Sequence, residues 1–205
     1  KFWTATRAEA RKKLGLDDAF TIFSVGGSSG ANAINKMAAD IMAWHCKEGK
    51  INHIHGYGKH GRENFPKMLE ERGIDLNDYP RIQAREYIDD MALWTAAADL
   101  VISRAGAITI SELEVLGKPS ILVPYPYAAE NHQYHNAKVL EDHRAAILVE
   151  EKDYSKEAII ERIEELYHSP EKLEELGKNA ASLAVYDTTR QIYDRIMEEL
   201  SKGRS

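Results

Sequence analysis

The stretch ADLVISRAGAITISELEVLGKPSILVP, at residues 98–124, predicts one complete strand–turn–helix–strand unit. Its two apolar runs, residues 99–103 and 120–123, have the length of buried strands, and Gly117 stands where a helix commonly ends. The helical part between them places three apolar residues on one side: Ile110, Leu113 and Leu116. Two short buried strands joined by a helix pair in parallel through a right-handed crossover. The stretch therefore predicts a parallel sheet, in which ligands bind beyond the carboxyl ends of the strands.

The rest of the chain continues this alternation of strands and helices. Further strands are expected at residues 19–25, 51–55, 81–84 and 145–149. Helices are expected at residues 32–46 and 130–141, and in two segments that end at Gly73 and Ala97. This order predicts an α/β fold with a doubly wound, Rossmann-like parallel sheet. Residues 1–205 form a single domain in this interpretation, with residues 155–205 as a helical tail that is broken near residues 169–170 and 186–187.

Composition excludes several classes of protein. The formal net charge of −6 argues against a nucleic-acid-binding surface, which needs a basic stripe. Cys46 is the only cysteine, so no disulfide forms within the chain and a reducing compartment is expected. No apolar run approaches the roughly 20 residues of a membrane-spanning helix, and the first residues have no signal-peptide pattern. Residues 1–16 are amphipathic and begin abruptly, so we expect them to continue from a longer chain.

A glycine-rich turn, GGSSGA at residues 26–31, joins the first expected strand to its helix. Glycines allow a backbone to approach an anion closely, and the free N–H groups at a helix start attract a phosphate. The pattern differs from the dinucleotide fingerprint and lacks the lysine of a P-loop. The alternative is an ordinary turn in which Ser28 or Ser29 caps the helix. The residues alone leave both interpretations open.

The turn after residue 103 also allows two interpretations. Thr109 and Glu112 have the spacing of a capping box, with Thr109 at the N-cap, and this is the simpler of the two. In the other, Gly106, Ala107 and Thr109 offer N–H and hydroxyl donors to a diphosphate. A carboxylate such as that of Glu112 could then accept hydrogen bonds from both hydroxyls of a ribose.

Polar side chains open the helix expected near residue 130. Gln133 and Asn136 are three residues apart, and His132 and Asn136 four apart, so they can share a face. Carboxamides donate and accept hydrogen bonds at once, which suits sugar hydroxyls. A polar helix start beside a Pro-rich turn explains the same residues equally well.

Two pairs of histidines raise the question of a metal. His53 and His55 alternate on a strand and point to one face, and His132 and His135 lie on a helix. Neither pair comes with a carboxylate or cysteine set at metal-ligand spacing. The chain has no Ser-His-Asp signature and no nucleophile elbow. We therefore expect neither a metal nor another cofactor, and no catalytic residue is assigned.

Five segments, in this order, resemble the MurG family of peptidoglycan glycosyltransferases. They are GGSSGA at residues 26–31, YIDDM at 87–91, ADLVISRAGAITISEL at 98–113, GKPSILVPYPYA at 117–128 and ENHQYHNA at 130–137. The resemblance spans nearly all of this chain but only the carboxyl-terminal half of the family's two-domain GT-B architecture. It implies a fold that is one half of a GT-B glycosyltransferase.

The resemblance also implies UDP-N-acetylglucosamine (UDP-GlcNAc) as the donor and a role for each matching residue. The diphosphate would be held by Ser28, Gly106, Ala107, Ile108 and Thr109. The uracil would meet the backbone of Ile88, with Tyr87 and Met91 beside it. Glu112 would bind the ribose. The GlcNAc hydroxyls would be contacted by His132, Gln133 and Asn136.

The implied function is donor binding in an inverting glycosyltransferase that moves GlcNAc onto lipid I, to make lipid II for peptidoglycan. The family's amino-terminal half, which does not match here, would supply the general base, the lipid I site and the membrane-facing surface. This chain alone is therefore expected to be inactive. The complete enzyme is expected in the cytoplasm at the inner face of the bacterial cell membrane, attached only through that other half.

Two further functions remain open at this point. The chain could be a stand-alone UDP-GlcNAc-binding subunit of a two-chain glycosyltransferase. It could also be an enzyme of another class on a similar fold, such as a UDP-sugar epimerase, which would need carboxylates or histidines facing C2 of the sugar. A generic NAD-binding domain is disfavoured because the fingerprint glycines are absent after the first strand.

Overall fold

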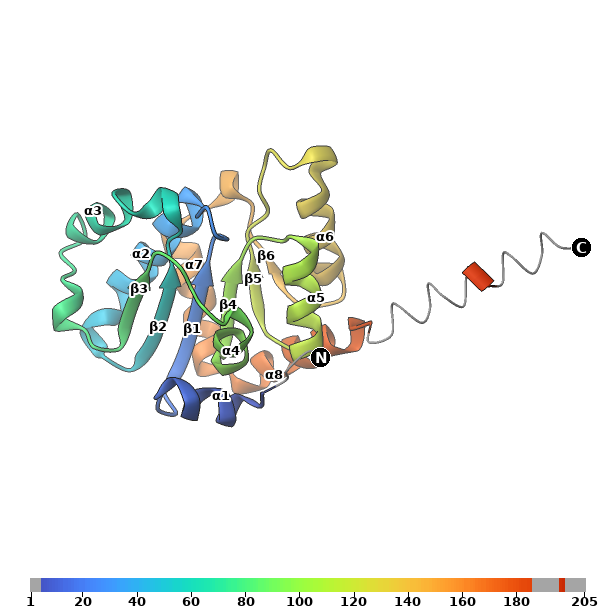
Figure 1. Cartoon of the computed structure of the whole chain (residues 1–205), viewed down its shortest axis with the longest axis horizontal. Helices are drawn as coiled ribbons and strands as arrows, with labels where there is room; N and C mark the ends of the chain where they lie inside the picture. Colours follow the sequence, from blue (N-terminus) through green and yellow to red (C-terminus); the bar gives the residue numbers. More distant parts are fainter. Residues whose placement is uncertain (1–4, 186–195, 198–205) are drawn as a thin grey trace, which may run out of the picture.

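A computed structural model describes residues 5–185 and 196–197 of the chain. It contains a six-stranded sheet in which neighbouring strands are parallel, in the order β3-β2-β1-β4-β5-β6 (Figure 1). The strands are β1 (Phe20–Val25), β2 (Ile51–Gly56), β3 (Ile82–Arg85), β4 (Leu100–Ser103), β5 (Ser120–Leu122) and β6 (Ile147–Leu148). The α-helices are α1 (Arg7–Leu14), α2 (Asn32–His45), α3 (Asn64–Glu70), α4 (Met91–Ala97), α5 (Ala107–Leu116), α6 (His132–Asp142), α7 (Lys156–His168) and α8 (Pro170–Leu183).

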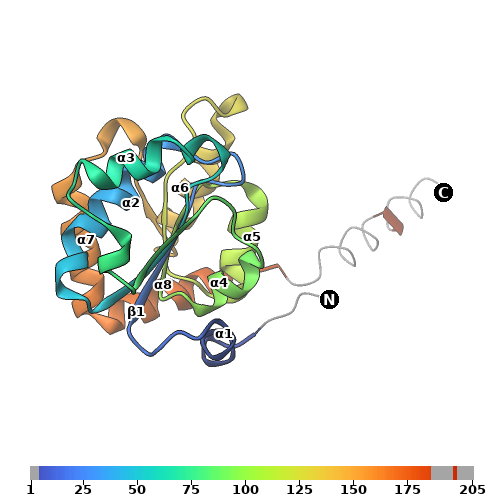
Figure 2. The ribbon, with the colours of Figure 1, turned by 60° about the vertical axis from the view of Figure 1, so that its left-hand side comes forward.

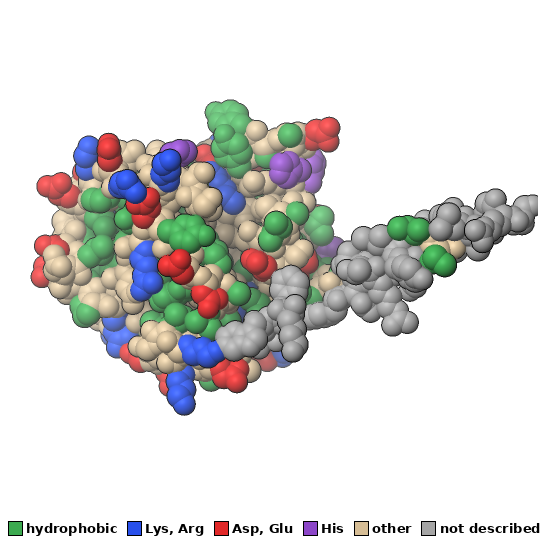
Figure 3. Space-filling view, in the orientation of Figure 1, with side chains coloured by type: hydrophobic (Ala, Val, Ile, Leu, Met, Phe, Trp, Pro, Cys, Tyr) green, Lys and Arg blue, Asp and Glu red, His purple; other side chains and the backbone are tan. Residues whose placement is uncertain are grey.

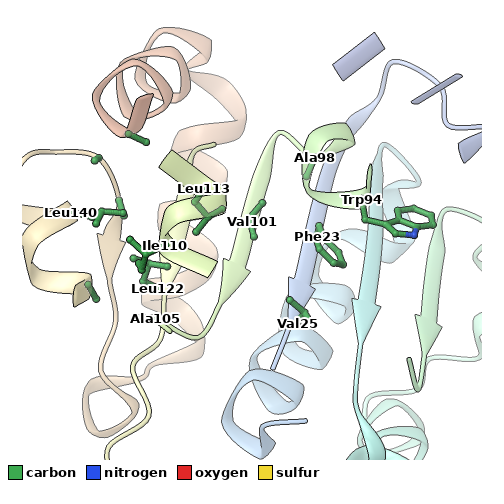
Figure 4. Packing of buried hydrophobic residues seen from close by; sticks show 14 of the residues in the cluster. Phe23, Val25, Trp94, Ala98, Val101, Ala105, Ile110, Leu113, Leu122 and Leu140 are labelled. Carbon is green, nitrogen blue, oxygen red and sulfur yellow. The ribbon is translucent and has the colours of Figure 1, made fainter. Parts of the chain in front are cut away.

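Helices cover both faces of the sheet, which makes the strands buried on both sides. Ile22 of β1 packs in a cluster with Ile34 of α2 and Ile163 of α7. Its neighbour Phe23 points to the opposite face and packs in a cluster with Trp94 of α4 (Figure 4). Figure 2 shows α2, α3 and α7 on one side of the sheet and α4 and α5 on the other. The predicted doubly wound, Rossmann-like α/β fold is therefore confirmed.

The predicted strands and helices are present, and most of their ends shift by only a few residues. The last strand is the shortest: β6 has two residues, where residues 145–149 were expected. The helix expected from about residue 130 begins at His132, behind the 3₁₀ turn Ala129–Asn131. Glu130 and Asn131 both have positive φ in this turn, of 50° and 53°, so the chain cannot already be α-helical there.

The segment after residue 155 folds against the rest of the domain. The chain breaks at Ser169, as predicted, between α7 and α8. Three residues of α7 are buried against the sheet: Ile159, Ile163 and Leu166. A Cβ on Gly177 of α8 would lie 2.7 Å from the Gly117 carbonyl oxygen, so α8 crosses the end of α5 in close contact. The expected break at residues 186–187 lies outside the described residues.

A buried ion pair holds α1 at the amino ends of the central strands, along the lower edge in Figure 1. Arg11, only 2% exposed, lies 2.6 Å from the Asp99 carboxylate and donates to the Ala97 carbonyl oxygen. Nearby, Lys118 donates to the carbonyl oxygens at the end of α4, and burial lowers the pKa of its amine to about 8. With α1 at the amino edge, the carboxyl edge is the free one.

None of the helices that the structure describes is long and apolar enough to cross a membrane.

Candidate functional site

The direction of chain crossing reverses between β1 and β4. From β1 the chain passes to β2 and β3, whereas from β4 it passes to β5 and β6 on the other side. Val25 and Ser103, the last residues of β1 and β4, are paired in register, so the two following turns begin side by side. A reversal of strand order is where open α/β sheets bind ligands. The sheet therefore brings the glycine-rich turn and the turn at residues 104–106 to the same place.

The glycine-rich turn leaves the first N–H groups of α2 uncapped. The N-cap of α2 is Ala31, and no described side chain hydrogen-bonds to this end of the helix. The alternative in which Ser28 or Ser29 caps the helix is wrong, because both residues lie in the turn that precedes the N-cap position. The first N–H groups of a helix have no helical partner, and the helix dipole makes this end positive. The turn is suited to an anion.

Residues 57–60, which we call the brace, hold the glycine-rich turn by hydrogen bonds. The N–H of Lys59 donates to the Ser28 carbonyl oxygen at 3.2 Å. The N–H of His60 donates to the Ser29 carbonyl oxygen at 2.9 Å. Both carbonyls of the serine pair are thereby occupied, so the turn can offer N–H and hydroxyl donors while its acceptors are satisfied.

Two glycines allow the turn and the brace to touch through their backbones. Gly30 and Gly58 both have positive φ, of 83° and 70°. A Cβ on Gly58 would lie 2.1 Å from the Gly30 nitrogen, and a Cβ on Gly30 would lie 2.2 Å from the Tyr57 carbonyl oxygen. Only glycine fits both conditions, since it lacks Cβ and tolerates positive φ. The turn and the brace therefore form one structural unit.

The second turn exposes the start of α5 in the same way. Its N-cap is Gly106, without a side-chain cap from any described residue, and Ala107, Ile108 and Thr109 are its first three residues. The capping box expected from Thr109 and Glu112 is wrong, because Thr109 already lies inside the helix. Gly106 is extended, with φ −70° and ψ 148°, so the chain becomes helical three residues earlier than that motif requires. Backbone N–H groups at two adjacent helix starts are thus left for a ligand.

Glu112 lies on the second turn of α5, one helical turn beyond Thr109, and so shares its face. Its side chain is half-buried, and this burial raises the pKa of its carboxyl group. No side chain or backbone group in the described ranges hydrogen-bonds to this carboxylate. A hydroxyl-bearing ligand can therefore use both of its oxygens.

Arg104, which the sequence prediction did not include, joins the turns that follow β4 and β5. Its Nη1 donates to the carbonyl oxygens of Val123 and Pro124, each at 3.0 Å, and lies 2.6 Å from the Glu151 carboxylate. Its guanidinium also lies over the Tyr125 ring, 5.4 Å from the centroid. The signal in the sequence is a single arginine in a turn otherwise made of small residues. Its Nη1 thereby positions the turns, whereas its Nε and Nη2 have no hydrogen-bond partner among the described residues.

The three polar residues expected on α6 lie on its first two turns, and two of them contact the neighbouring turns. Gln133 Oε1 accepts a hydrogen bond from the Tyr125 N–H at 3.0 Å. Asn136 Nδ2 donates to the Ala105 carbonyl oxygen at 3.1 Å. His132 is exposed at the first helical position. Each carboxamide therefore positions a turn with one end and keeps the other end for a ligand.

Residues 87–91 connect β3 to α4 and offer both backbone and side chains. Ile88 is buried, and its side chain packs so closely on Gly56 that a Cβ there would lie 2.8 Å from Ile88 Cγ1. Only the backbone of Ile88 is left for a ligand, which fits the backbone contact implied by the resemblance. Tyr87 is 64% exposed beside it, and Met91 is half-buried as the first residue of α4.

The two histidine pairs lie on β2 and on α6. His53 and His55 point to the same face of β2, as predicted, and both hydrogen-bond to Ser24 there. Across residues 5–185 and 196–197, the side chains form no group of three or more His, Cys, Asp or Glu that could hold a metal ion.

The candidate site lies at the carboxyl edge of the sheet, where β1 and β4 end. Two hollows among the described residues, of about 530 and 330 Å³, are lined by Phe65 and its neighbours and by Tyr134 and its neighbours. Neither is lined by the uncapped helix starts. Figure 3 shows acidic and basic side chains interspersed over the visible face, with no continuous basic stripe. The arrangement can hold an anion on one side and leaves the other side open to a second surface.

Comparison with known proteins assigns the family. The model of the glycosyltransferase family 28 C-terminal domain matches residues 21–192. The chain belongs to glycosyltransferase family 28. The match includes every strand of the sheet, so this family-28 domain contains both uncapped helix starts and the residues of α6.

Curated relatives of this family-28 domain share one name. They are called UDP-N-acetylglucosamine–N-acetylmuramyl-(pentapeptide) pyrophosphoryl-undecaprenol N-acetylglucosamine transferase. The protein from Desulforamulus reducens is 40% identical over 82% of this chain and 45% of its own length. The protein from Acetivibrio thermocellus is 38% identical over 98% of this chain and 53% of its own length. The chain spans about half the length of the curated relatives it matches.

Solved structures agree with this assignment. Acinetobacter baumannii MurG has a TM-score of 0.77 and 29% identity, over 95% of this chain and 54% of MurG. HepE from Anabaena, in complex with UDP, has a TM-score of 0.65 and 20% identity, over 96% of this chain and 52% of HepE. UDP-GlcNAc 2-epimerase from Neisseria meningitidis has a TM-score of 0.63 at 14% identity, over 94% of this chain and 48% of the epimerase. The last two share the fold alone. The family-28 domain has the fold of one half of a GT-B glycosyltransferase.

Proposed function

We propose that this family-28 domain binds UDP-GlcNAc, as the donor half of an inverting hexosyltransferase that transfers GlcNAc to lipid I. One observation carries the proposal: two helix starts without side-chain caps, those of α2 and α5, lie side by side where the strand order reverses. Backbone N–H groups at such ends bind phosphates without bringing a full positive charge. The name of the relatives supplies the substrates.

The diphosphate lies between the two turns in this proposal. Ser28 offers its exposed hydroxyl, and the first residues of α5 offer N–H groups: Gly106, Ala107, Ile108 and Thr109. Ile108 contributes only its backbone, because its 79% exposed side chain is apolar. These donors are fixed before the ligand arrives, which is the condition for stabilising charge that develops on a leaving group.

The nucleoside lies over residues 87–91 and α5. The uracil edge meets the backbone of Ile88, with Tyr87 and Met91 on either side. Glu112 accepts hydrogen bonds from the ribose hydroxyls with its otherwise unoccupied carboxylate. The ionised form suits ribose recognition, because each of its two oxygens can accept a hydrogen bond from one hydroxyl.

The GlcNAc group lies toward α6. His132, Gln133 and Asn136 face this side, and the two carboxamides each retain hydrogen-bonding capacity after their contacts with the turns. A carboxamide held at one end presents its other end in a fixed direction, which favours one arrangement of sugar hydroxyls.

The transfer itself needs a second surface. The muramyl 4-hydroxyl attacks C1 of the α-linked GlcNAc in line. The bond from C1 to the diphosphate oxygen breaks, UDP leaves and a β-1,4 bond forms. The hydroxyl proton passes to a general base that we place, with the lipid I site, on the amino-terminal half of the GT-B enzyme. In this proposal the complete enzyme acts in the cytoplasm at the inner face of the cell membrane, through that other half.

Isothermal titration of the chain with UDP, UDP-GlcNAc and NAD tests the proposal. We expect binding of UDP and UDP-GlcNAc but not of NAD, because the dinucleotide fingerprint is absent. Binding of NAD with comparable affinity, or of none of the three, would refute it. Product analysis with the complete enzyme separates a transferase, which releases UDP, from an epimerase, which returns a UDP-sugar inverted at C2.

A further inference from the structure

Three histidines outside the proposed donor site form a buried chain of hydrogen bonds with Ser24. His45 Nε2 lies 3.1 Å from His53 Nδ1. His53 Nε2 and His55 Nδ1 each lie 2.8 Å from Ser24 Oγ. All four residues are at most 3% exposed. The chain of contacts therefore runs from the end of α2 along the side chains of β1 and β2, and all of its members are buried.

The same chain continues to the brace. His55 Nε2 lies 3.1 Å from Asn35 Oδ1, and Asn35 Nδ2 donates to the Tyr57 carbonyl oxygen at 3.1 Å. Asn35 is 2% exposed and lies one turn into α2. Its own N–H donates to the carbonyl of Ala31, the last residue of the glycine-rich turn. Asn35 is thus linked both to the turn and to the brace.

The last contact determines the direction of the hydrogen bonds. The Tyr57 carbonyl can only accept, so Asn35 presents its NH2 group to Tyr57 and its oxygen to His55. The opposite orientation of the amide would place two acceptors against each other. His55 then donates from Nε2. Its Nδ1 accepts from the Ser24 hydroxyl at 2.8 Å, which is closer than the Ser24 carbonyl oxygen at 3.1 Å.

Beyond Ser24 the same order holds. The Ser24 hydroxyl has a single proton, and it donates this proton in the hydrogen bond to His55 Nδ1. Ser24 Oγ therefore accepts a hydrogen bond from His53 Nε2, and His53 Nδ1 accepts one from His45 Nε2. His45 Nδ1 ends the chain as a buried acceptor with no partner among the described residues. Burial lowers the pKa of His45 to about 4 and that of His55 to about 3. The histidines are therefore neutral near pH 7, as one-way hydrogen bonding requires.

We propose that Asn35 and His55 are positioning residues for the diphosphate-binding turn. Asn35 holds the Tyr57 carbonyl oxygen, the atom that a Cβ on Gly30 would meet first, and His55 holds Asn35. Without Asn35 and His55, the N–H groups of the brace lose the fixed position from which they donate hydrogen bonds to the two serine carbonyls. Neither Asn35 nor His55 needs to contact the donor. This inference rests on the proposed donor site.

Side-chain ¹⁵N NMR of the histidines in the full chain tests the hydrogen-bond order without any ligand. We expect neutral Nε2–H tautomers for His45, His53 and His55 at pH 7. The exposed His143, replaced in His143→Gln, serves to assign the spectrum and as the matched histidine control. A proton on His55 Nδ1, which also lies 3.1 Å from the Ser24 carbonyl oxygen, would overturn the order.

The positioning role is tested with Asn35→Leu and His55→Gln, either of which suffices if the other fails to fold. We expect the Lys59 and His60 amides to exchange with solvent at least about tenfold faster, and UDP affinity to fall about tenfold. Affinity for uridine, which lacks the diphosphate, should stay unchanged. An equal loss for uridine and UDP, or unchanged exchange at the two amides, would overturn the role.

The two proposals fail differently. If the unmodified chain does not bind UDP, the donor site is wrong and the positioning role falls with it. If the unmodified chain and its folded Asn35→Leu variant bind UDP equally well, the positioning role alone is wrong.

Discussion

The side-chain oxygen of Gln133 accepts a hydrogen bond from the Tyr125 N–H at 3.0 Å, which ties α6 to the turn after β5. Gln133 therefore has two roles in the proposed site, and they use different ends of one carboxamide. The oxygen positions a turn, and the NH2 group is left for the sugar. Substitutions can separate these roles.

Gln133→Ala should reduce affinity for UDP-GlcNAc and leave affinity for UDP unchanged, because α6 follows a different strand from the phosphate turns. Gln133→Glu keeps an oxygen for Tyr125 but removes the donor NH2 group. We expect it to lose about tenfold in UDP-GlcNAc affinity as well. Titration of both variants with both ligands measures this. A parallel loss of UDP affinity in Gln133→Ala would place the residue at the nucleotide instead.

Glu112→Ala should weaken UDP binding by about 1.5–3 kcal/mol, through loss of charge-assisted hydrogen bonds to the ribose. The melting temperature should hardly change, because Glu112 takes part in no capping box. Glu114→Ala is the matched control: it removes another half-buried carboxylate from α5 whose pKa is also raised by burial. Titration and thermal melting of both variants are compared. A lower melting temperature with unchanged UDP affinity would count against the ribose role.

The chain alone should bind UDP-GlcNAc and transfer nothing. Positioning the acceptor against the donor provides a large part of the rate of a transfer reaction, and in our proposal the acceptor site lies on the other half of the enzyme. The measurement uses labelled UDP-GlcNAc and a lipid I analogue, with the chain alone and with an added amino-terminal half from a relative. Transfer by the chain alone would show that it contains the general base.

The free energy of unfolding should decrease as the pH falls from about 6.5 toward 4. Burial holds the pKa values of His45, His53 and His55 below their ordinary value, so the folded chain stays unprotonated where the unfolded chain takes up protons. Above about pH 6.5 the three neutral histidines make their full contribution to the free energy of unfolding. Below that pH, each histidine lowers the free energy of unfolding by up to about 1.4 kcal/mol per pH unit. Urea unfolding at several pH values measures the slope.

His53→Gln should flatten that slope, whereas replacement of the exposed His143 by Gln should leave it as it is. A free energy of unfolding that does not change between pH 7 and 5 would contradict the prediction.

The sheet could be predicted because its strands are covered on both faces. Such strands consist almost wholly of apolar residues, as residues 99–103 and 120–123 do, and a helix pattern between them fixes the parallel direction. The ends of the elements were predictable to within a few residues. The proposed position of the site rests on the same reasoning, since ligands bind at the carboxyl edge of such sheets.

The helix starts could not be predicted from local spacing. Thr109 and Glu112 fit a capping box, yet the path of the chain from β4 makes Gly106 the N-cap. Likewise Ala31, and not Ser28 or Ser29, occupies the N-cap position of α2, without a side-chain cap. Both differences leave N–H groups uncapped, where local hydrogen bonding alone would have favoured a cap. The proposed site thus lies where the local rules fail.

The histidine chain was only partly predictable. Alternation along a strand indicates that His53 and His55 share a face. Their partners Ser24 and Asn35 lie on other elements, so no spacing in the sequence indicates them. The sequence did not indicate the brace for the same reason, because it is the pairing of β1 with β2 that brings the brace beside the glycine-rich turn.

The backbone contact between Gly30 and Gly58 limits how this turn could be moved to another protein. Grafting residues 26–31 onto a different βα unit would transfer their sequence without the surface that shapes them. The recipient protein would also need a glycine in the neighbouring loop at the position of Gly58, and a backbone carbonyl at the position of that of Tyr57. The smallest transplantable unit is therefore two adjacent loops together with the paired strands β1 and β2 that present them.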